Sequence, residues 1–245
     1  MSEWDLSKYP KVEPPISIEK LPPEEIALEV KSHPSFFHKF EVGDKFLWLD
    51  YDYPEKKLTW VDQSEVAGKM LFQGEECFEI RSKCHHFTSA EKHTTYWYRA
   101  LREDEMVTLL SIYWEPDKTG KIVFHNWREP RFIKTGDKWQ GIEESGQGEA
   151  KQISESVEEV DGPYLVRIGE SEAKCLRWML ASNYKAKGRL DSAEMFISIE
   201  SGLTFLFRRY NGRGWKNLDK LKTCPKIAYE GETYYLWYDC LVFRD

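Results

Sequence analysis

Apolar and polar residues alternate with a period of two along most of the chain after residue 42, which is typical of β-strands. In the segment 45–53, the odd positions share one face of a strand, and the even positions, among them Asp50 and Asp52, share the other. Segments with similar alternation, rich in aromatic and β-branched residues, predict the further strands. These are 58–72, 77–83, 94–101, 106–114, 121–127, 138–144, 150–160, 164–168, 173–180, 194–200, 203–210 and 233–243.

The connections between these segments are short and rich in turn residues, as at 116–120 (PDKTG), Ser201-Gly202 and Glu230-Gly231. Short connections imply antiparallel pairing, and no helical pattern of 10–15 residues alternates with the strands, which argues against a parallel sheet. Long strands of a twisted sheet curl to cover their apolar face. We therefore predict a mainly β fold, in which an antiparallel curved sheet forms a barrel or half-barrel.

Two segments depart from this pattern. Six of the 11 prolines fall within the first 34 residues, so residues 1–21 are expected to form an extended arm. The run 21–25 (LPPEE) predicts the start of a short N-terminal helix that ends at Pro34, and a second short helix is predicted at 216–222. We expect an arm and helix over 1–41 and a single β domain over 42–245.

The β region contains a weak internal repeat. The sequence GDKF at 43–46 is echoed by GDKW at 136–139, and in each half a long polar strand, a strand around a cysteine and an aromatic strand follow in the same order. This order predicts two repeat units, 42–133 and 134–211, followed by a helix and hairpin over 212–245.

The same order of segments resembles that of the lipoprotein-carrier-like β half-barrels and of bacterial domains similar to them. The resemblance rests on the entry VGDKFLW at 42–48, the long charged strands and the closing SGLTF at 201–205, and it covers residues 42–211. It includes no diagnostic catalytic motif, and the chain departs from the family in lacking a lipid-attachment cysteine. The resemblance implies a concave sheet that holds an apolar ligand.

Aromatic residues make up 15% of the chain, more than a β-sandwich of this size requires for its core. The large rings lie on predicted strands, so they form either a dry core or the wall of a ligand pocket. Arg177 lies beside Trp178 and could supply a polar group to such a pocket. The candidate ligand-binding residues are Trp48, Trp60, Trp97, Tyr98, Arg177 and Trp178.

Charge and cysteine usage narrow the class of protein. The chain carries 35 Lys and Arg against 42 Asp and Glu, and this acidic balance argues against a nucleic-acid partner. No apolar run reaches 18 residues and no secretory-signal pattern is present, so we expect no membrane span. Five cysteines without CxxC spacing indicate reduced thiols in a cytoplasmic protein, with a Cys224–Cys240 disulfide as the alternative. The basic run 208–215 could hold a phosphate, but a solvated turn is the preferred interpretation.

Candidate catalytic groups are few. The nucleotide, zinc-protease and serine-hydrolase motifs are absent from the sequence. The cluster Cys84-His85-His86, with His93 nearby, matches no standard zinc spacing, so we expect neither a metal nor another cofactor. A histidine near its neutral-range pKa could act as a general base beside a carboxylate. The candidates for such a pair are His86, His93, His125, Asp50 and Asp52.

Three functions remain open. The first is non-catalytic binding of a hydrophobic or aromatic small molecule, or a lipid, by a monomer or homodimer whose sheet encloses the ligand. The second is an enzyme, such as a cyclase, isomerase or hydrolase, that uses the same cavity for acid–base chemistry. The third is a protein-interaction module in which sheet edges or the arm 1–21 bind another chain.

Overall fold

The computed structural model describes residues 5–33, 36–37, 41–88, 92–114, 121–145, 152–184, 189–216 and 218–244. Within these residues one 14-stranded antiparallel sheet dominates the fold. Its strands are β1 (Ile16–Lys20), β5 (Lys45–Asp52), β6 (Lys57–Phe72), β7 (Glu75–His86), β8 (Lys92–Leu101), β9 (Glu105–Trp114), β10 (Lys121–Pro130), β12 (Lys138–Ser145), β13 (Gln152–Ile168), β14 (Ser171–Tyr184), β15 (Arg189–Ser198), β16 (Thr204–Asn211), β17 (Lys226–Tyr229) and β18 (Glu232–Arg244). The predicted mainly β, antiparallel fold is confirmed.

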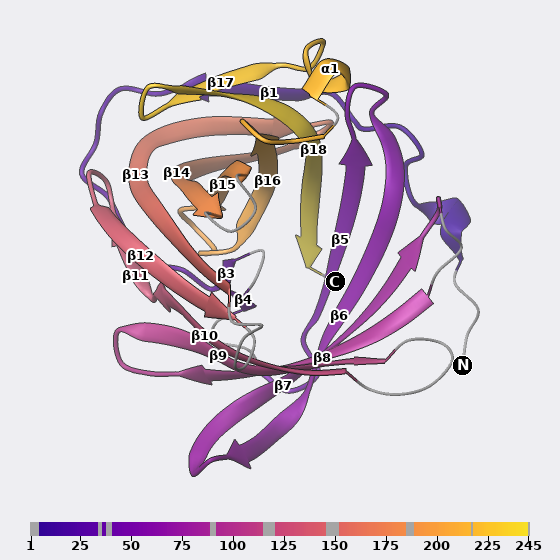
Figure 1. Ribbon diagram of the computed structural model, residues 1–245, viewed down its shortest axis with the longest axis vertical. Coiled ribbons are helices and arrows are strands. Elements are labelled where there is room, and N and C mark those ends of the chain that lie inside the picture. Colours follow the sequence, from indigo (N-terminus) through magenta and orange to yellow (C-terminus); the bar gives the residue numbers. More distant parts are fainter. Residues whose placement is uncertain are drawn as a thin grey trace.

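The sheet is strongly curved (Figure 1). Successive strands pair from β5 to β10 and again from β12 to β16, and β18 joins the two arcs by pairing with β5 and β16. On the far side, β10 and β12 are paired at one position, His125 with Ser145. Strand β13 pairs with β12 along one edge and with β14 along the other. The inner face therefore surrounds a shared interior.

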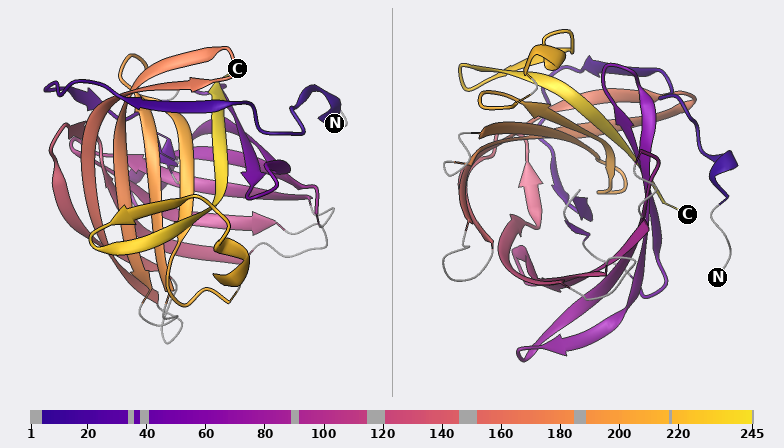
Figure 2. Two further views of the ribbon diagram at one scale, coloured as in Figure 1. Left: turned by 90° about the horizontal axis from the view of Figure 1, so that it is seen from above. Right: turned by 45° about the vertical axis from the view of Figure 1, so that its right-hand side comes forward.

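The N-terminal segment lies partly inside this interior and partly outside it. Strand β1 pairs with β13 on the outside, whereas β2 (Ala27–Glu29) pairs with β11 (Phe132–Lys134). Strands β3 (Ser32–His33) and β4 (Phe36–Phe37) pair with each other and lie within the curve of the sheet (Figures 1 and 2). Backbone hydrogen bonds hold the N-terminal segment where it enters the interior: Val30 N donates to Arg131 O, and Lys31 N donates to Gly202 O.

The predicted N-terminal helix is wrong, since the segment after the double proline is extended and forms β2. Ile26, Leu28 and Val30 are apolar at every second position, which suits one face of a strand. Pairing with β11 buries Leu28 and Val30. The other predicted helix is confirmed in shorter form as α1 (Leu218–Leu221), and a 3₁₀ turn covers Leu6–Lys8.

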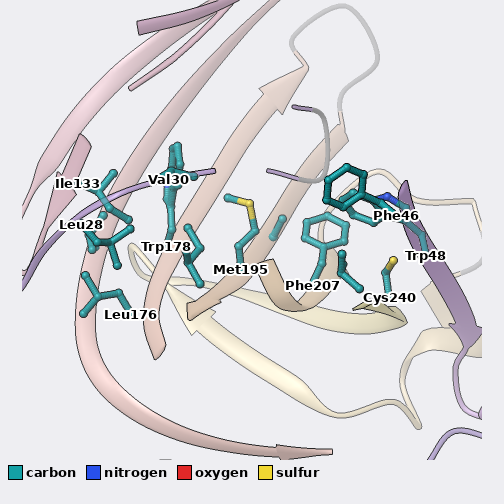
Figure 3. Packing of buried hydrophobic residues seen from close by; sticks show 14 of the residues in the cluster. Leu28, Val30, Phe46, Trp48, Ile133, Leu176, Trp178, Met195, Phe207 and Cys240 are labelled. Carbon is teal, nitrogen blue, oxygen red and sulfur yellow. The ribbon is translucent and has the colours of Figure 1, made fainter. Parts of the chain in front are cut away.

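The main apolar core fills the lower part of the interior (Figure 3). Leu28 and Val30 of the N-terminal segment pack there against inward-facing side chains of the sheet, which come from both arcs. Figure 3 labels Ile133 of β11 and, from the large sheet, Phe46, Trp48, Leu176, Trp178, Met195, Phe207 and Cys240. A second cluster lies on the outer face, where Tyr9 and Ile18 of the arm cover Tyr51 and Val166.

Two turns at corresponding places in the two arcs have the same hydrogen bonds. In each turn, a glycine amide donates to the carbonyl of one valine, and the amide of that valine donates to the carbonyl of the aspartate that follows the glycine. The valine lies on the second strand after the turn, β6 in one arc and β13 in the other. In each, the aspartate side chain also accepts from the backbone amide three residues earlier. The corresponding residues are Gly43 and Gly136, Asp44 and Asp137, and Val66 and Val160.

Candidate functional site

A cavity of about 440 Å³ lies between β5, β6, β16 and β18. It is on the face of β5 that carries Trp48, because Asp50 and Asp52 follow Trp48 at intervals of two. A volume of this size suits a small organic molecule. The cavity is lined by Asp50, Asp52, Thr59, Trp60, Thr88, Arg209, Trp237 and Tyr238.

Two further cavities have different walls. One of about 510 Å³ lies beside the hairpin between β15 and β16, and its lining combines apolar side chains, such as Phe46 and Leu203, with charged ones, such as Lys174 and Glu200. The other, of about 710 Å³, is lined largely by charged side chains such as Arg102 and Glu105, which already pair with each other. The 440 Å³ cavity combines three aromatic rings with two carboxyls and a guanidinium, which makes it the candidate site.

Strand register places the first row of site residues. Asp50 is directly opposite Trp60 on β6 and opposite Cys240 on β18, and Trp60 is in turn opposite His86 on β7. Directly opposite residues on neighbouring strands project from the same face of the sheet. The Trp60 and His86 rings meet edge to face with centroids 4.7 Å apart. Cys240, Asp50, Trp60 and His86 therefore form a line across four neighbouring strands.

A second row runs alongside the first. Arg209 of β16 is opposite Tyr238 of β18, which is opposite Asp52 of β5. Nη1 of Arg209 donates a hydrogen bond to the Tyr238 hydroxyl at 3.0 Å. A bulge between Arg209 and Tyr210 gives β18 one extra residue, Trp237, and a bulge redirects the side chains around it. The Trp237 ring lies 4.5 Å from the Tyr238 ring, centroid to centroid.

Burial sets the charge state of the site. Asp50 is only 5% exposed, and burial raises its pKa well above the ordinary value, although the Cys240 thiol donates a hydrogen bond to it and Arg209 lies near. The carboxylate of Asp62 raises the pKa of Asp50 further. Burial also raises the pKa of Asp52, which lies at the exposed rim, and that of Tyr238 to about 12. Burial therefore favours the protonated form of the Asp50 carboxyl at the floor of the cavity.

The aromatic wall holds unused hydrogen-bond donors. The indole Nε1 atoms of Trp60 and Trp237 are buried and have no hydrogen-bond partner among the described residues. Buried polar groups without a partner are uncommon in folded proteins and need an explanation, such as water or a ligand. By contrast, Asp62 behind the site is satisfied, because it accepts from Cys84 Sγ at 3.0 Å and from Ser64 Oγ at 3.2 Å.

Among the predicted ligand-binding residues, Trp60 lines this cavity and the others lie elsewhere. Trp178 is fully buried in the core, where Nε1 donates to Glu158, and Trp48 belongs to the same cluster. Trp97 is partly buried and packs against that cluster. Trp48 and Trp178 thus belong to the apolar core, and Trp97 packs against it. A core position was one of the two interpretations of the many aromatic residues, the other being a pocket wall.

The two remaining predicted ligand-binding residues are engaged in bonds outside the cavity. Tyr98 is buried, and its hydroxyl donates to Oε2 of Glu79 at 3.2 Å. Arg177 forms a two-pronged ion pair with Asp161, with both N–O distances at 2.8 Å. Neither residue lines the 440 Å³ cavity.

The catalytic candidates are only partly brought together. Asp50, Asp52 and His86 share one face, but Trp60 stands between Asp50 and His86, which separates the histidine from the carboxyl by about two strand spacings, roughly 10 Å. His93 is opposite Cys84 on β7, and His125 is opposite Ser145 on β12. The side chains of His93 and His125 lie outside what the structure describes. Among the described candidates, the strand register therefore does not bring His86 within hydrogen-bond distance of Asp50.

The structure also bears on the metal site, the disulfide and the membrane span considered from the sequence. No group of three or more His, Cys, Asp or Glu side chains suited to hold a metal ion occurs among the described residues. All five cysteines are free and buried, so the alternative of a Cys224–Cys240 disulfide is wrong. No helix in the described part of the chain is long and apolar enough to cross a membrane.

Three site residues escaped the sequence analysis: Arg209, Trp237 and Tyr238. Arg209 belongs to the run 208–215, whose interpretation as a solvated turn is wrong for its first residues because β16 extends to Asn211. The neighbouring Arg208 is half-buried and pairs with Asp239 on β18, Nε to Oδ1 at 3.3 Å. A strand assignment for 204–211 would have placed Arg209 on one face and Arg208 on the other.

The chain was also compared with known proteins. No protein-family model, no curated protein and no solved structure matches it.

Proposed function

We propose that the protein binds a small hydrophobic or aromatic molecule in the 440 Å³ cavity without transforming it. One observation carries the proposal, namely the concentration of Trp60, Trp237 and Tyr238 around a cavity that also presents Asp50 and Arg209. Ligand sites are commonly concave and mostly apolar, with a few polar groups that orient the ligand. The two buried indole N–H groups without protein partners add donors that a bound molecule or water could satisfy.

The proposed binding protein is a barrel or half-barrel built from two related halves, in the manner of the lipoprotein-carrier-like domains. Its support is the shared interior of the curved sheet and the matching hydrogen bonds of the turns at Gly43 and Gly136. Free, buried thiols suit a reducing compartment, so we place the protein in the cytoplasm, as a monomer or homodimer.

Native mass spectrometry of the freshly purified full chain, followed by calorimetric titration with 1-naphthalenemethanol, tests the proposal. We expect a co-purified small molecule or saturable binding of the probe. Trp60→Ala and Trp237→Ala should each weaken binding by at least about tenfold, since each removes an aromatic wall. Trp139→Ala is the matched control, because that ring contacts Trp178 and lines a different cavity. Absence of saturable binding to the native protein would refute the proposal.

A further inference from the structure

Acidic and cationic side chains are present in unequal numbers around the cavity. Two carboxyls line it, Asp50 at the floor and Asp52 at the rim, and a third, that of Asp62 on β6, acts on Asp50 from behind the site. Arg209 of β16 faces them, while β18 contributes the Tyr238 hydroxyl and the Cys240 thiol. On β7, Cys84 bonds to Asp62, and His86 contacts Trp60. Acidic groups therefore outnumber the cationic group that faces them among the described residues.

Arg209 is held toward the aromatic side of the cavity. Its Nη1 donates to the Tyr238 hydroxyl at 3.0 Å, and its guanidinium carbon lies 5.7 Å from the Tyr238 ring centroid and 6.0 Å from that of Phe207. Guanidinium groups in such positions are stabilised by ring faces and by hydrogen bonds. The hydrogen-bond donor recorded for the Asp50 side chain is a weak one, the thiol of Cys240. Arg209 lowers the pKa of this buried acid, but the effect of burial is larger, so the ionised form of Asp50 is disfavoured.

We infer that the cavity selects an organic cation, an ammonium group carried on an apolar or aromatic body, whose charge is seated against Asp50 among Trp60, Trp237 and Tyr238. The inference rests on the proposed function and specifies its ligand. Aromatic faces attract ammonium groups through their electron-rich centres, and the attraction increases where water is excluded. A carboxylate adds direct charge pairing, which is strong where water is excluded.

Proton release should accompany this binding. In the empty cavity, burial and, to a smaller extent, Asp62 raise the pKa of Asp50 and so favour its protonated form. A cation that arrives next to the carboxyl favours the ionised form, so the Asp50 O–H bond breaks and the proton passes to solvent. Affinity for a cation of fixed charge should therefore increase as pH rises, until Asp50 is ionised in the empty protein as well. An uncharged ligand gains no such dependence from Asp50.

Three naphthalene probes of similar size separate the classes of ligand: (1-naphthylmethyl)trimethylammonium, neutral 1-naphthalenemethanol and anionic 1-naphthoate. Calorimetric titration of the full chain, from pH 5.5 to 8.5 in buffers of different ionisation enthalpy, gives both affinity and proton release. We expect the cation to bind at least about tenfold more tightly than the alcohol at pH 8, with net release of a proton.

Variants locate the effect. Asp50→Asn, which preserves shape, should lower affinity for the cation about tenfold and remove its dependence on pH. Asp219→Asn makes the same substitution on the exposed helix α1, away from the cavity, and it should leave the preference for the cation intact. If Asp50→Asn does not fold, the pH dependence and proton release of the unmodified protein still decide the question.

The outcomes are distinct. Equal binding of the alcohol and the cation, or tightest binding of 1-naphthoate, would overturn the cation inference and leave the proposed binding function standing. Saturable binding of none of the three probes would refute the proposed function itself. Tighter binding of the cation without proton release and unaffected by Asp50→Asn would also overturn the inference, because the charge would then be bound elsewhere.

Discussion

Nε1 of Trp178 donates a 2.7 Å hydrogen bond to Oε2 of Glu158, and both side chains are buried on the inner face of the sheet. The other carboxyl oxygen accepts from Ser156 Oγ at 3.1 Å. The largest buried ring of the core thereby satisfies a carboxyl group that has little access to water. The Trp178 side chain therefore both fills space in the apolar core and donates a hydrogen bond to a buried carboxyl group.

Replacing Trp178 by Phe should destabilise the protein by about 2–4 kcal/mol, because it removes a donor to a buried carboxyl and leaves a void. Glu158→Gln should cost less, since the amide oxygen can still accept from the indole. Urea unfolding followed by circular dichroism measures both. An equal loss in the two variants would contradict the assigned role of the hydrogen bond.

The ion pair between Arg177 and Asp161 predicts a second stability effect. Both side chains are about one-quarter exposed and make two parallel bonds, so Arg177→Met should cost about 2 kcal/mol, because Asp161 then keeps the longer contact with Lys20 at 3.4 Å and the hydrogen bond from the Tyr164 hydroxyl. Arg167→Met removes a more exposed pair with Glu172 and should destabilise the protein much less, because water screens that pair. Denaturation midpoints that shift equally would argue against this difference.

Asp50 should make stability depend on pH. Its pKa is raised by burial in the folded chain, so the native state binds more protons than the unfolded state above about pH 4. The stabilisation from the protonated group is fully present below the unfolded pKa and is lost as pH rises through the folded pKa. Asp50→Asn should therefore raise the free energy of unfolding at pH 8 by about 1 kcal/mol or more and flatten the decline above neutrality. Unfolding curves collected between pH 5 and 9 test this.

Gly202 is predicted to hold the N-terminal segment in place. Its φ is +70°, and a Cβ there would overlap the carbonyl oxygen of Glu29. Gly202→Ala should cost about 3 kcal/mol or more and increase amide exchange at Val30 and Lys31. Gly74→Ala is the matched control, since its φ is +85° but its Cβ would meet nothing within 4 Å; about 1 kcal/mol is expected there. If both variants lost a similar free energy of unfolding, the positive φ alone would explain the destabilisation, without the overlap at Glu29.

The thiols should be unreactive until the chain unfolds. All five cysteines are buried, and burial raises the pKa of Cys175 to about 12 and that of Cys84 still further. Because the thiolate is the reactive form, Ellman's reagent at pH 8 should label the native protein slowly and all five cysteines in guanidinium chloride. Rapid labelling of a native thiol would show that its strand opens readily.

Much of the sheet is predictable from the sequence because alternation is a local property. The strand over 45–53 and its two faces follow from the positions of the residues, and so does the common face of Asp50 and Asp52. The error at Leu28 arose because the double proline and the two glutamates that follow it favour a helix start. Pairing with β11, more than 100 residues away in the sequence, decided in favour of a strand.

The site was only half predictable for a related reason. Trp60 and Asp50 belong to neighbouring strands joined by a short turn, so a hairpin prediction already brings them together. Arg209, Trp237 and Tyr238 reach the cavity because β18 inserts beside β5 and because one bulge turns Trp237 toward it. Long-range pairing and a one-residue irregularity leave no periodic signal in a single sequence.

The position of β18 also constrains the order of assembly during synthesis. Strand β18 lies between β5, made early, and β16, made late, so one edge of each of these strands stays unpaired until β18 emerges from the ribosome. Until then the two arcs present unpaired edges, which attract other unpaired strands. The growing chain is therefore most exposed to wrong strand pairing at the stage when residues 232–244 are still inside the ribosome.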